Sequence, residues 1–109
     1  MDETWYEAVI AAHTAVTDAV SHGRRLKSER FFVWQEDGAA DLEADDIHAE
    51  KAMSGTTDFF TKIEFDPWAA ALGEAFDASP RIVWRLESAE YEEDTGFWHW
   101  LWRWRVYGG

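Results

Sequence analysis

The chain contains no cysteine among its 109 residues, which excludes disulfide bridges, cysteine zinc sites and thiol nucleophiles. It also lacks any apolar run that approaches the roughly 18 residues of a membrane-spanning helix. The first residues lack the basic start of a secretory signal peptide, so we expect a cytoplasmic product. No linker, internal repeat or low-complexity tract divides the sequence, and its length suits a single domain over residues 1–109.

Basic residues are scarce. Ten Lys and Arg stand against 22 Asp and Glu, which gives a formal net charge of −12. Nonspecific contact with nucleic acid or with an anionic membrane depends on Lys and Arg, so the charge balance argues against both. We expect neither a membrane partner nor sequence-specific nucleic-acid binding.

Tryptophan is abundant instead, with eight residues in the chain. Between residues 97 and 107 one set of alternate positions is Trp98, Trp100, Trp102, Trp104 and Val106. A period of two is the side-chain period of a β-strand, whereas a helix would scatter these indoles around its axis. The other set is mixed in polarity: Phe97, His99, Leu101, Arg103, Arg105 and Tyr107. We expect one face of this strand to meet the core and the other to meet a helix, a second subunit or a ligand.

The other periodicities complete a pattern of two helices and five strands. Helices are expected over residues 2–21, ended by Gly23, and over 66–78; strands are expected over 30–35, 41–53, 57–65, 81–91 and 97–107. Asp37-Gly38 is a hairpin signal, and residues 38–55 are expected to form an acidic, mobile hairpin or loop. The predicted fold class is α+β in the order α-β-β-β-α-β-β, with an antiparallel or mixed sheet packed by two helices.

The last two strands form a predicted hairpin. In it, Trp84 and Leu86 would lie beside Trp102 and Trp104. The helix over residues 66–78 is expected to cover this tryptophan face with its own apolar positions, which are Trp68, Leu72 and Phe76. We expect His99, on the opposite face, to lie near an acid of the neighbouring strand, such as Glu87 or Glu90.

No constellation typical of catalysis is found. The four histidines lie on separate predicted elements without the spacing of zinc ligands. The acidic cluster from Glu36 to Glu50 could offer oxygens to calcium, but it lacks the glycine and glutamate positions of an EF-hand loop. Glu92 and Glu93 lie at a solvated turn that suits general-acid work poorly. We therefore predict no catalytic residue, no cofactor and no metal.

Three segments carry a resemblance: FVWQEDG at 32–38, GTTDFFTKIEFDP at 55–67 and YEEDTG at 91–96. With the order of elements, they resemble the small tail-completion proteins of long-tailed phages and prophages of Gram-positive bacteria. This group comprises tail terminators and head-to-tail joining proteins, and the resemblance does not separate the two. It covers residues 30–107. The chain departs from the group in the tryptophan-rich version of its last strand.

The resemblance implies a structural virion protein, assembled in the host cytoplasm, that forms a ring at the tail end or at the head-tail joint. The implied partners are further copies of the chain, the tail-tube protein and the head-connector protein. A ring built by head-to-tail contacts needs two unlike patches on each subunit, and aromatic residues favour such interfaces. The expected interaction residues are Asp41, Glu43, Asp45, Asp46, Phe97, Leu101, Arg103 and Arg105.

Two other classes of function stay open. A DNA-mimic inhibitor would occupy a basic groove and would space its acids along one exposed face. A carbohydrate-binding module would stack sugars on the row from Trp98 to Trp104, which requires a flat face that is open to solvent.

Overall fold

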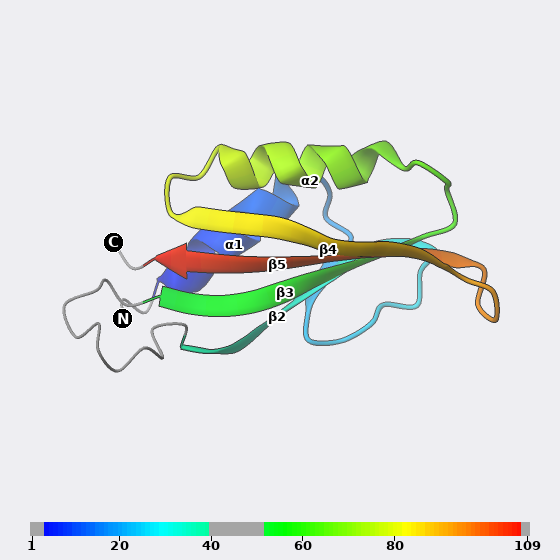
Figure 1. Ribbon diagram of the computed structural model, residues 1–109, viewed down its shortest axis with the longest axis horizontal. Helices are drawn as coiled ribbons and strands as arrows, with labels where there is room; N and C mark the ends of the chain where they lie inside the picture. Colours follow the sequence, from blue (N-terminus) through cyan, green and yellow to red (C-terminus); the bar gives the residue numbers. More distant parts are fainter. Residues whose placement is uncertain (1–3, 40–51, 108–109) are drawn as a thin grey trace.

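Five strands form one twisted sheet, and both helices pack against the same side of it (Figure 1). The computed structural model describes residues 4–39 and 52–107. In chain order the elements are α1 (Trp5–Thr14), β1 (Val20–His22), β2 (Arg30–Ala39), β3 (Ala52–Thr61), α2 (Pro67–Asp77), β4 (Ile82–Glu92) and β5 (Phe97–Tyr107). The strand order is β1-β2-β3-β5-β4, with β1 parallel to β2 and all other neighbours antiparallel. The predicted α+β class and order of elements are confirmed, and the sheet is mixed.

The first helix is shorter than predicted. It ends at Thr14, and part of the segment expected to be helical forms β1 instead. The Thr17 hydroxyl accepts a hydrogen bond from the backbone N–H of Ala19 at 3.1 Å, and this local turn competes with helical bonding. Gly23 was expected to end the helix; it follows β1, with a φ of 80°.

The hairpin turn predicted at Asp37-Gly38 is wrong. A bulge between Glu36 and Gly38 absorbs one extra residue, so β2 continues to Ala39. Gly38 has a φ of 127°, which a glycine adopts without strain. The Asp-Gly pair therefore bends a strand here and does not reverse the chain.

The bounds predicted for the strand over 57–65 are corrected, because β3 spans Ala52–Thr61. Of the strand predicted over 41–53, only residues 52 and 53 are described, and they belong to β3. β3 ends where the Thr61 hydroxyl accepts a hydrogen bond from the N–H of Ile63 at 3.1 Å. Residues 40–51 lie outside the described residues, and so does most of the acidic segment predicted over 38–55.

The tryptophan row of β5 forms the floor of the main core. Trp102 is 2% exposed, and Trp104 and Val106 are buried with it. The residues that cover them come from both helices: Val9 and Ala12 from α1, and Leu72 and Phe76 from α2. The predicted covering of this face by the second helix is confirmed for this part of the row.

The register of the last hairpin agrees with the prediction. Trp84 lies opposite Trp104, and Leu86 lies opposite Trp102. Toward the turn of the hairpin the same face is less covered, because Trp98 is only partly buried. The row is therefore divided into a core half and a half that water still reaches.

Asp66 fixes the start of α2. Its carboxylate accepts the N–H of Trp68 at 2.9 Å as an N-cap, and Pro67 opens the helix as predicted. It also accepts two hydrogen bonds from Arg30, at 2.7 and 2.8 Å, and one from the Thr61 hydroxyl at 2.6 Å. Burial alone would raise the pKa of this carboxyl, but these hydrogen bonds lower it overall. The turn before α2 is thus tied to β2 and β3.

A glycine makes room for Trp104. A β-carbon at Gly55 would lie 2.3 Å from the indole ring of Trp104 and 2.4 Å from the carbonyl oxygen of Gln35. The second atom belongs to the backbone of β2 and cannot yield without moving the strand. Any larger residue at Gly55 would displace either the indole or the sheet.

His13 is buried in the core, and both of its ring nitrogens are hydrogen-bonded. Its Nδ1 lies 2.7 Å from the carbonyl oxygen of Val9, and its Nε2 lies 2.8 Å from the hydroxyl of Thr57. Trp104 Nε1 donates to the same hydroxyl at 2.9 Å. The hydroxyl therefore donates to Nε2, and Nδ1 carries the imidazole proton. Burial lowers the pKa of His13 to about 4, although its bond to Val9 acts in the other direction.

Replacing Trp102 by alanine is expected to lower the free energy of unfolding by about 3–5 kcal/mol, the usual cost for a buried aromatic side chain. Trp98→Ala is the matched control, because it removes the same side chain from the partly exposed end of the row. It should cost less. Urea unfolding followed by circular dichroism measures both, and equal losses would contradict the division of the row.

His13 is expected to make the fold sensitive to acid. The unfolded chain binds a proton near the ordinary pKa of 6.5, whereas the folded chain binds it only near 4. Stability should therefore fall as pH drops from 6.5 to 4, by about 3 kcal/mol from this group at 1.36 kcal/mol per pKa unit. Urea unfolding at several pH values tests this, with His13→Gln as the control. A wild-type pH dependence equal to that of the variant would contradict it.

Candidate interaction face

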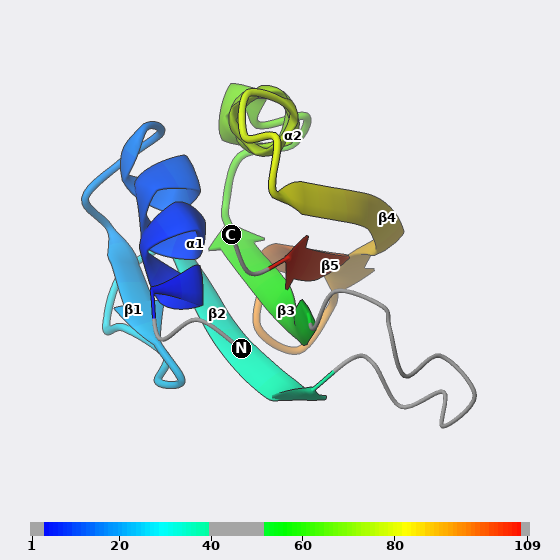
Figure 2. The same cartoon turned by 90° about the vertical axis from the view of Figure 1, so that its left-hand side faces the viewer.

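The side of the sheet away from the two helices is the candidate site, termed the open face. In Figure 2 the strands run in an arc from β1 to β4, and α1 and α2 lie inside that arc. On β5 the open face carries four of the predicted interaction residues: Phe97, Leu101, Arg103 and Arg105. The other four, Asp41, Glu43, Asp45 and Asp46, lie outside the described residues.

The link between β1 and β2 covers one part of the open face. Leu26 of this link packs against a small second core, which consists of Phe31, Val33 and Phe60. The Arg25 guanidinium lies 4.0 Å from the ring centroid of Phe60, a cation–π contact. Phe97 adds to this cluster, with its ring 5.8 Å from that of Phe60. Phe97 is thus partly committed to packing within the subunit.

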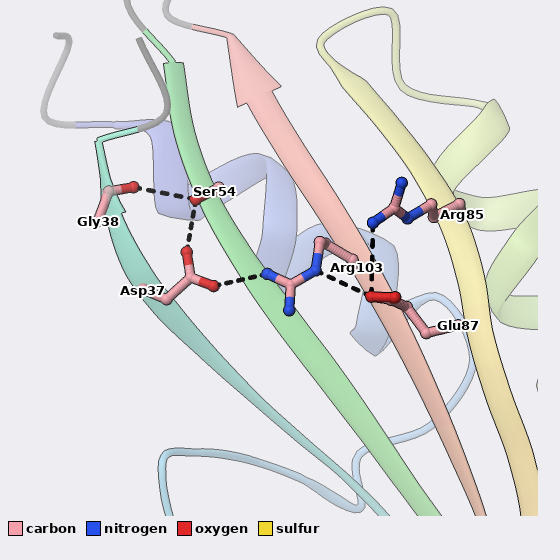
Figure 3. A network of polar contacts seen from close by, with 6 residues as sticks. All are labelled: Asp37, Gly38, Ser54, Arg85, Glu87 and Arg103. Atoms are coloured by element: carbon pink, nitrogen blue, oxygen red, sulfur yellow. Dashed lines mark hydrogen bonds and ion pairs between the residues drawn. The ribbon is translucent and has the colours of Figure 1, made fainter. Parts of the chain in front are cut away.

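Farther along β5 the open face carries a chain of ion pairs across the strands (Figure 3). Arg103 donates from Nη1 to Asp37 at 2.9 Å and from Nε to Glu87 at 3.1 Å. Arg85 lies 3.6 Å from the same Glu87 oxygen, and Ser54 donates to Asp37. Four strands are connected in this way, from Asp37 on β2 to Arg85 on β4.

Both strand irregularities bring acids to this network. The bulge of β2 includes Asp37, and a second bulge between Leu86 and Ser88 includes Glu87 on β4. The hydrogen bond from Arg103 lowers the pKa of Glu87, although partial desolvation acts against it. These pairs are solvent-exposed, so they position the arginines more than they stabilise the fold.

His99 forms a second polar cluster nearer the hairpin turn. Its Nε2 lies 2.5 Å from a carboxylate oxygen of Asp58, and its Nδ1 lies 2.9 Å from one of Glu92. A neutral imidazole has one N–H and could donate to only one of them, whereas an imidazolium donates to both. The bond to Asp58 is the largest cause of a raised pKa at His99, and Glu92 adds to it, against partial desolvation. The ring also stacks on Phe60 at 4.3 Å.

An acid of the neighbouring strand, such as Glu87 or Glu90, was expected beside His99; an acid of β4 is confirmed there, but it is Glu92. The β4 bulge turns Glu87 toward Arg103, and the hydrogen bonds of His99 go to Asp58 and Glu92, although Glu90 lies opposite it in the ladder. Sequence reasoning also missed the roles of Asp37, Ser54 and Arg85. In the sequence, the only indication of these roles is the position of the residues within their strands. The two bulges shift the register of those strands, and the alternation of apolar and polar residues does not reveal a bulge.

The open face has the groups needed for binding another molecule. Within residues 4–39 and 52–107, no three His, Asp or Glu side chains are placed to hold a metal ion together. No helix in this part of the chain has the length and apolarity needed to cross a membrane. The open face offers fixed charges of both signs and partly exposed apolar groups, which is the composition of a protein-protein contact surface.

Comparison with known proteins gives one line of similarity. No family model and no curated protein matches the sequence. Among solved structures, a chain from "Virion of native gene transfer agent (GTA) particle" is similar over 95% of this chain and 92% of its own, with a TM-score of 0.53 and 20% identity. The two chains therefore share a fold along nearly their whole length. The tail-terminator role and Gram-positive origin suggested by the sequence rest on the resemblance alone.

Because the pKa of His99 is raised, its contribution to the free energy of unfolding should depend on pH with the opposite sign to that of His13. The folded chain holds the His99 proton above the unfolded value of 6.5, so this contribution to stability is complete below pH 6.5 and is lost as pH rises through the folded pKa. NMR titration of the ring should give a pKa above 6.5. Asp58→Asn is the test variant and should lower it, while Glu90→Gln is the control. A value at or below 6.5 in the wild type would contradict the double pairing.

Proposed function

We propose that this chain is a structural protein of a phage-like virion and acts by assembly, without chemistry of its own. The observation that carries the proposal is the likeness in fold to a chain of a gene transfer agent virion, which extends over almost all of both chains. The resemblance in sequence to tail-completion proteins supports the finer proposal of a ring at the tail end or at the head-tail joint. The partners would then be further copies, the tail-tube protein and the head-connector protein.

The surfaces of the subunit agree with this role. The open face and the partly covered end of the tryptophan row lie on different sides of one sheet, so each subunit offers two unlike surfaces. A heterologous contact between unlike surfaces closes into a ring when the rotation between neighbours does. We expect the free protein to be a monomer or a weak oligomer, since a ring formed before the tail is complete would have nothing to terminate.

The two alternative classes receive less support. Trp102 and Trp104 are buried under the helices, so the tryptophan row is no open platform for sugar stacking. The acids of the open face that would imitate DNA phosphates are instead paired: Asp37 and Glu87 with Arg103, and Asp58 with His99.

Removal of the gene from a strain that produces such particles tests the proposal. We expect capsids and tails that fail to join, or tails of abnormal length, when lysates are viewed by negative-stain electron microscopy. A plasmid copy should restore complete particles, and mass spectrometry should find the chain in them. Complete, infectious or gene-transferring particles without the chain would contradict a structural role in the virion.

A matched pair of variants in the plasmid copy addresses the open face. Leu101→Asp places a charge on the half-buried part of that face, whereas Ala11→Asp places one on the exposed side of α1. The first should reduce particle yield and the second should not. Melting curves of the purified variants separate an assembly defect from unfolding.

A further inference from the structure

Phe65 is exposed in a strained conformation. Its φ is 56°, and it is the only non-glycine residue with a positive φ in the described part of the chain. Its side chain is 83% exposed, far more than that of any other large apolar residue described. A bulky residue in the left-handed region costs free energy, and such strain persists where the surroundings impose it. Phe65 borders an apolar hollow beside α2 together with Leu86 and Trp100, but a residue that is 83% exposed gains little there to offset this cost.

The neighbours of Phe65 hold it in place. Asp66, the next residue, is 2% exposed, and its carboxylate is bonded to Arg30, Thr61 and the N–H of Trp68. The turn therefore cannot relax without breaking a buried network. Phe65 therefore projects from a turn that is held in place by hydrogen bonds, and the exposed Glu64 precedes it.

A hollow of about 270 Å³ lies at the other end of the sheet. Arg85, Arg103 and Arg105 line it, together with Val83 and Ser54. Asp37 and Glu87 fix the guanidinium of Arg103, whereas Arg105 has no ion pair with any described residue. Val83 is 52% exposed and gives the hollow an apolar wall. Guanidinium groups beside an apolar wall suit an aromatic ring that carries a carboxylate next to it.

One subunit cannot place its own Phe65 in its own hollow. On β3, Ser54 pairs with Arg105 at the hollow, and Thr61 pairs with Trp98 toward Phe65. This stretch of strand alone spans about 23 Å at 3.3 Å per residue. The projecting ring and the hollow are thus separated along the longest dimension of a subunit that measures 45 × 24 × 21 Å.

We propose that Phe65 of one copy enters the arginine-lined hollow of a second copy, with Glu64 of the first facing Arg105 of the second. The contact joins unlike surfaces, so it repeats from copy to copy as a ring requires. It also places a carboxylate against the arginine that lacks a partner among the described residues. The inference rests on the proposed assembly role and names the contact that carries it.

Cysteine crosslinking tests the contact directly, because the chain has no cysteine of its own. Chains with Ile63→Cys, an exposed position that keeps both Glu64 and Phe65, are mixed with chains carrying Val83→Cys, which keep the three arginines. Oxidation should give the mixed dimer about tenfold or more faster than a mixture of Ile63→Cys with Ala11→Cys, because the contact raises the effective concentration. A single chain with both Ile63→Cys and Val83→Cys should give a ladder of oligomers.

Two further variants attribute the effect to the proposed groups. Adding Phe65→Ser to the Ile63→Cys chain should remove the rate advantage. Adding Arg105→Glu to the Val83→Cys chain should reduce it, because Glu64 of the partner then faces a like charge, whereas Arg24→Glu, the same charge change at an exposed position in the β1–β2 link, should not. Circular dichroism confirms that each chain is folded.

Equal rates for the two mixtures, or an advantage that survives Phe65→Ser, would overturn the proposal. Crosslinking of Val83→Cys in particles to a different virion protein, with no product from Ile63→Cys, would assign the hollow to that protein and would also overturn it. Neither result bears on whether the chain is needed for particles, which the gene deletion decides separately.

Discussion

The position of Trp104 over Gly55 is the constraint on which the rest of the structure depends. The indole crosses β3 where a side chain would collide with it and with β2. Its N–H is bonded to the Thr57 hydroxyl, and that hydroxyl is bonded to His13 of α1. One glycine therefore makes room for the indole that links the sheet to the first helix. These hydrogen bonds satisfy the polar atoms of Trp104, Thr57 and His13, as burial in an apolar core requires.

Because the helices occupy one side of the sheet, the other side is free to carry charge. The open face combines acids with arginines and a histidine. Arg103 is paired with Asp37 and Glu87, and His99 is paired with Asp58 and Glu92. Such pairs contribute little to folding when exposed. Their effect is to give a strongly acidic protein a local surface where guanidinium groups dominate. A surface of that kind selects its partner by charge as well as by shape.

The sequence predicted the features that depend on alternation and capping. The tryptophan face of β5, its register with Trp84 and Leu86, and the start of α2 at Asp66-Pro67 all follow local rules and are confirmed. The length of α1 and the bulges of β2 and β4 were not predicted. Neither the turn bonded through Thr17 nor an extra residue in a strand changes the local pattern of apolar and polar residues on which the prediction depends. The arginine network was missed for the same reason, because bulges decide which acids face Arg103.

The bulge of β4 has a consequence for how copies of the chain can meet. β4 is an outer strand of the described sheet, and an outer strand with free backbone groups can recruit a strand from another molecule. The irregular pairing between Leu86 and Ser88 interrupts the flat edge, and the charged Arg85 and Glu87 flank it. On the opposite edge, β1 has only three residues and offers little to extend. These edges offer little for strand pairing between copies, so the proposed contact between copies would rest on side chains.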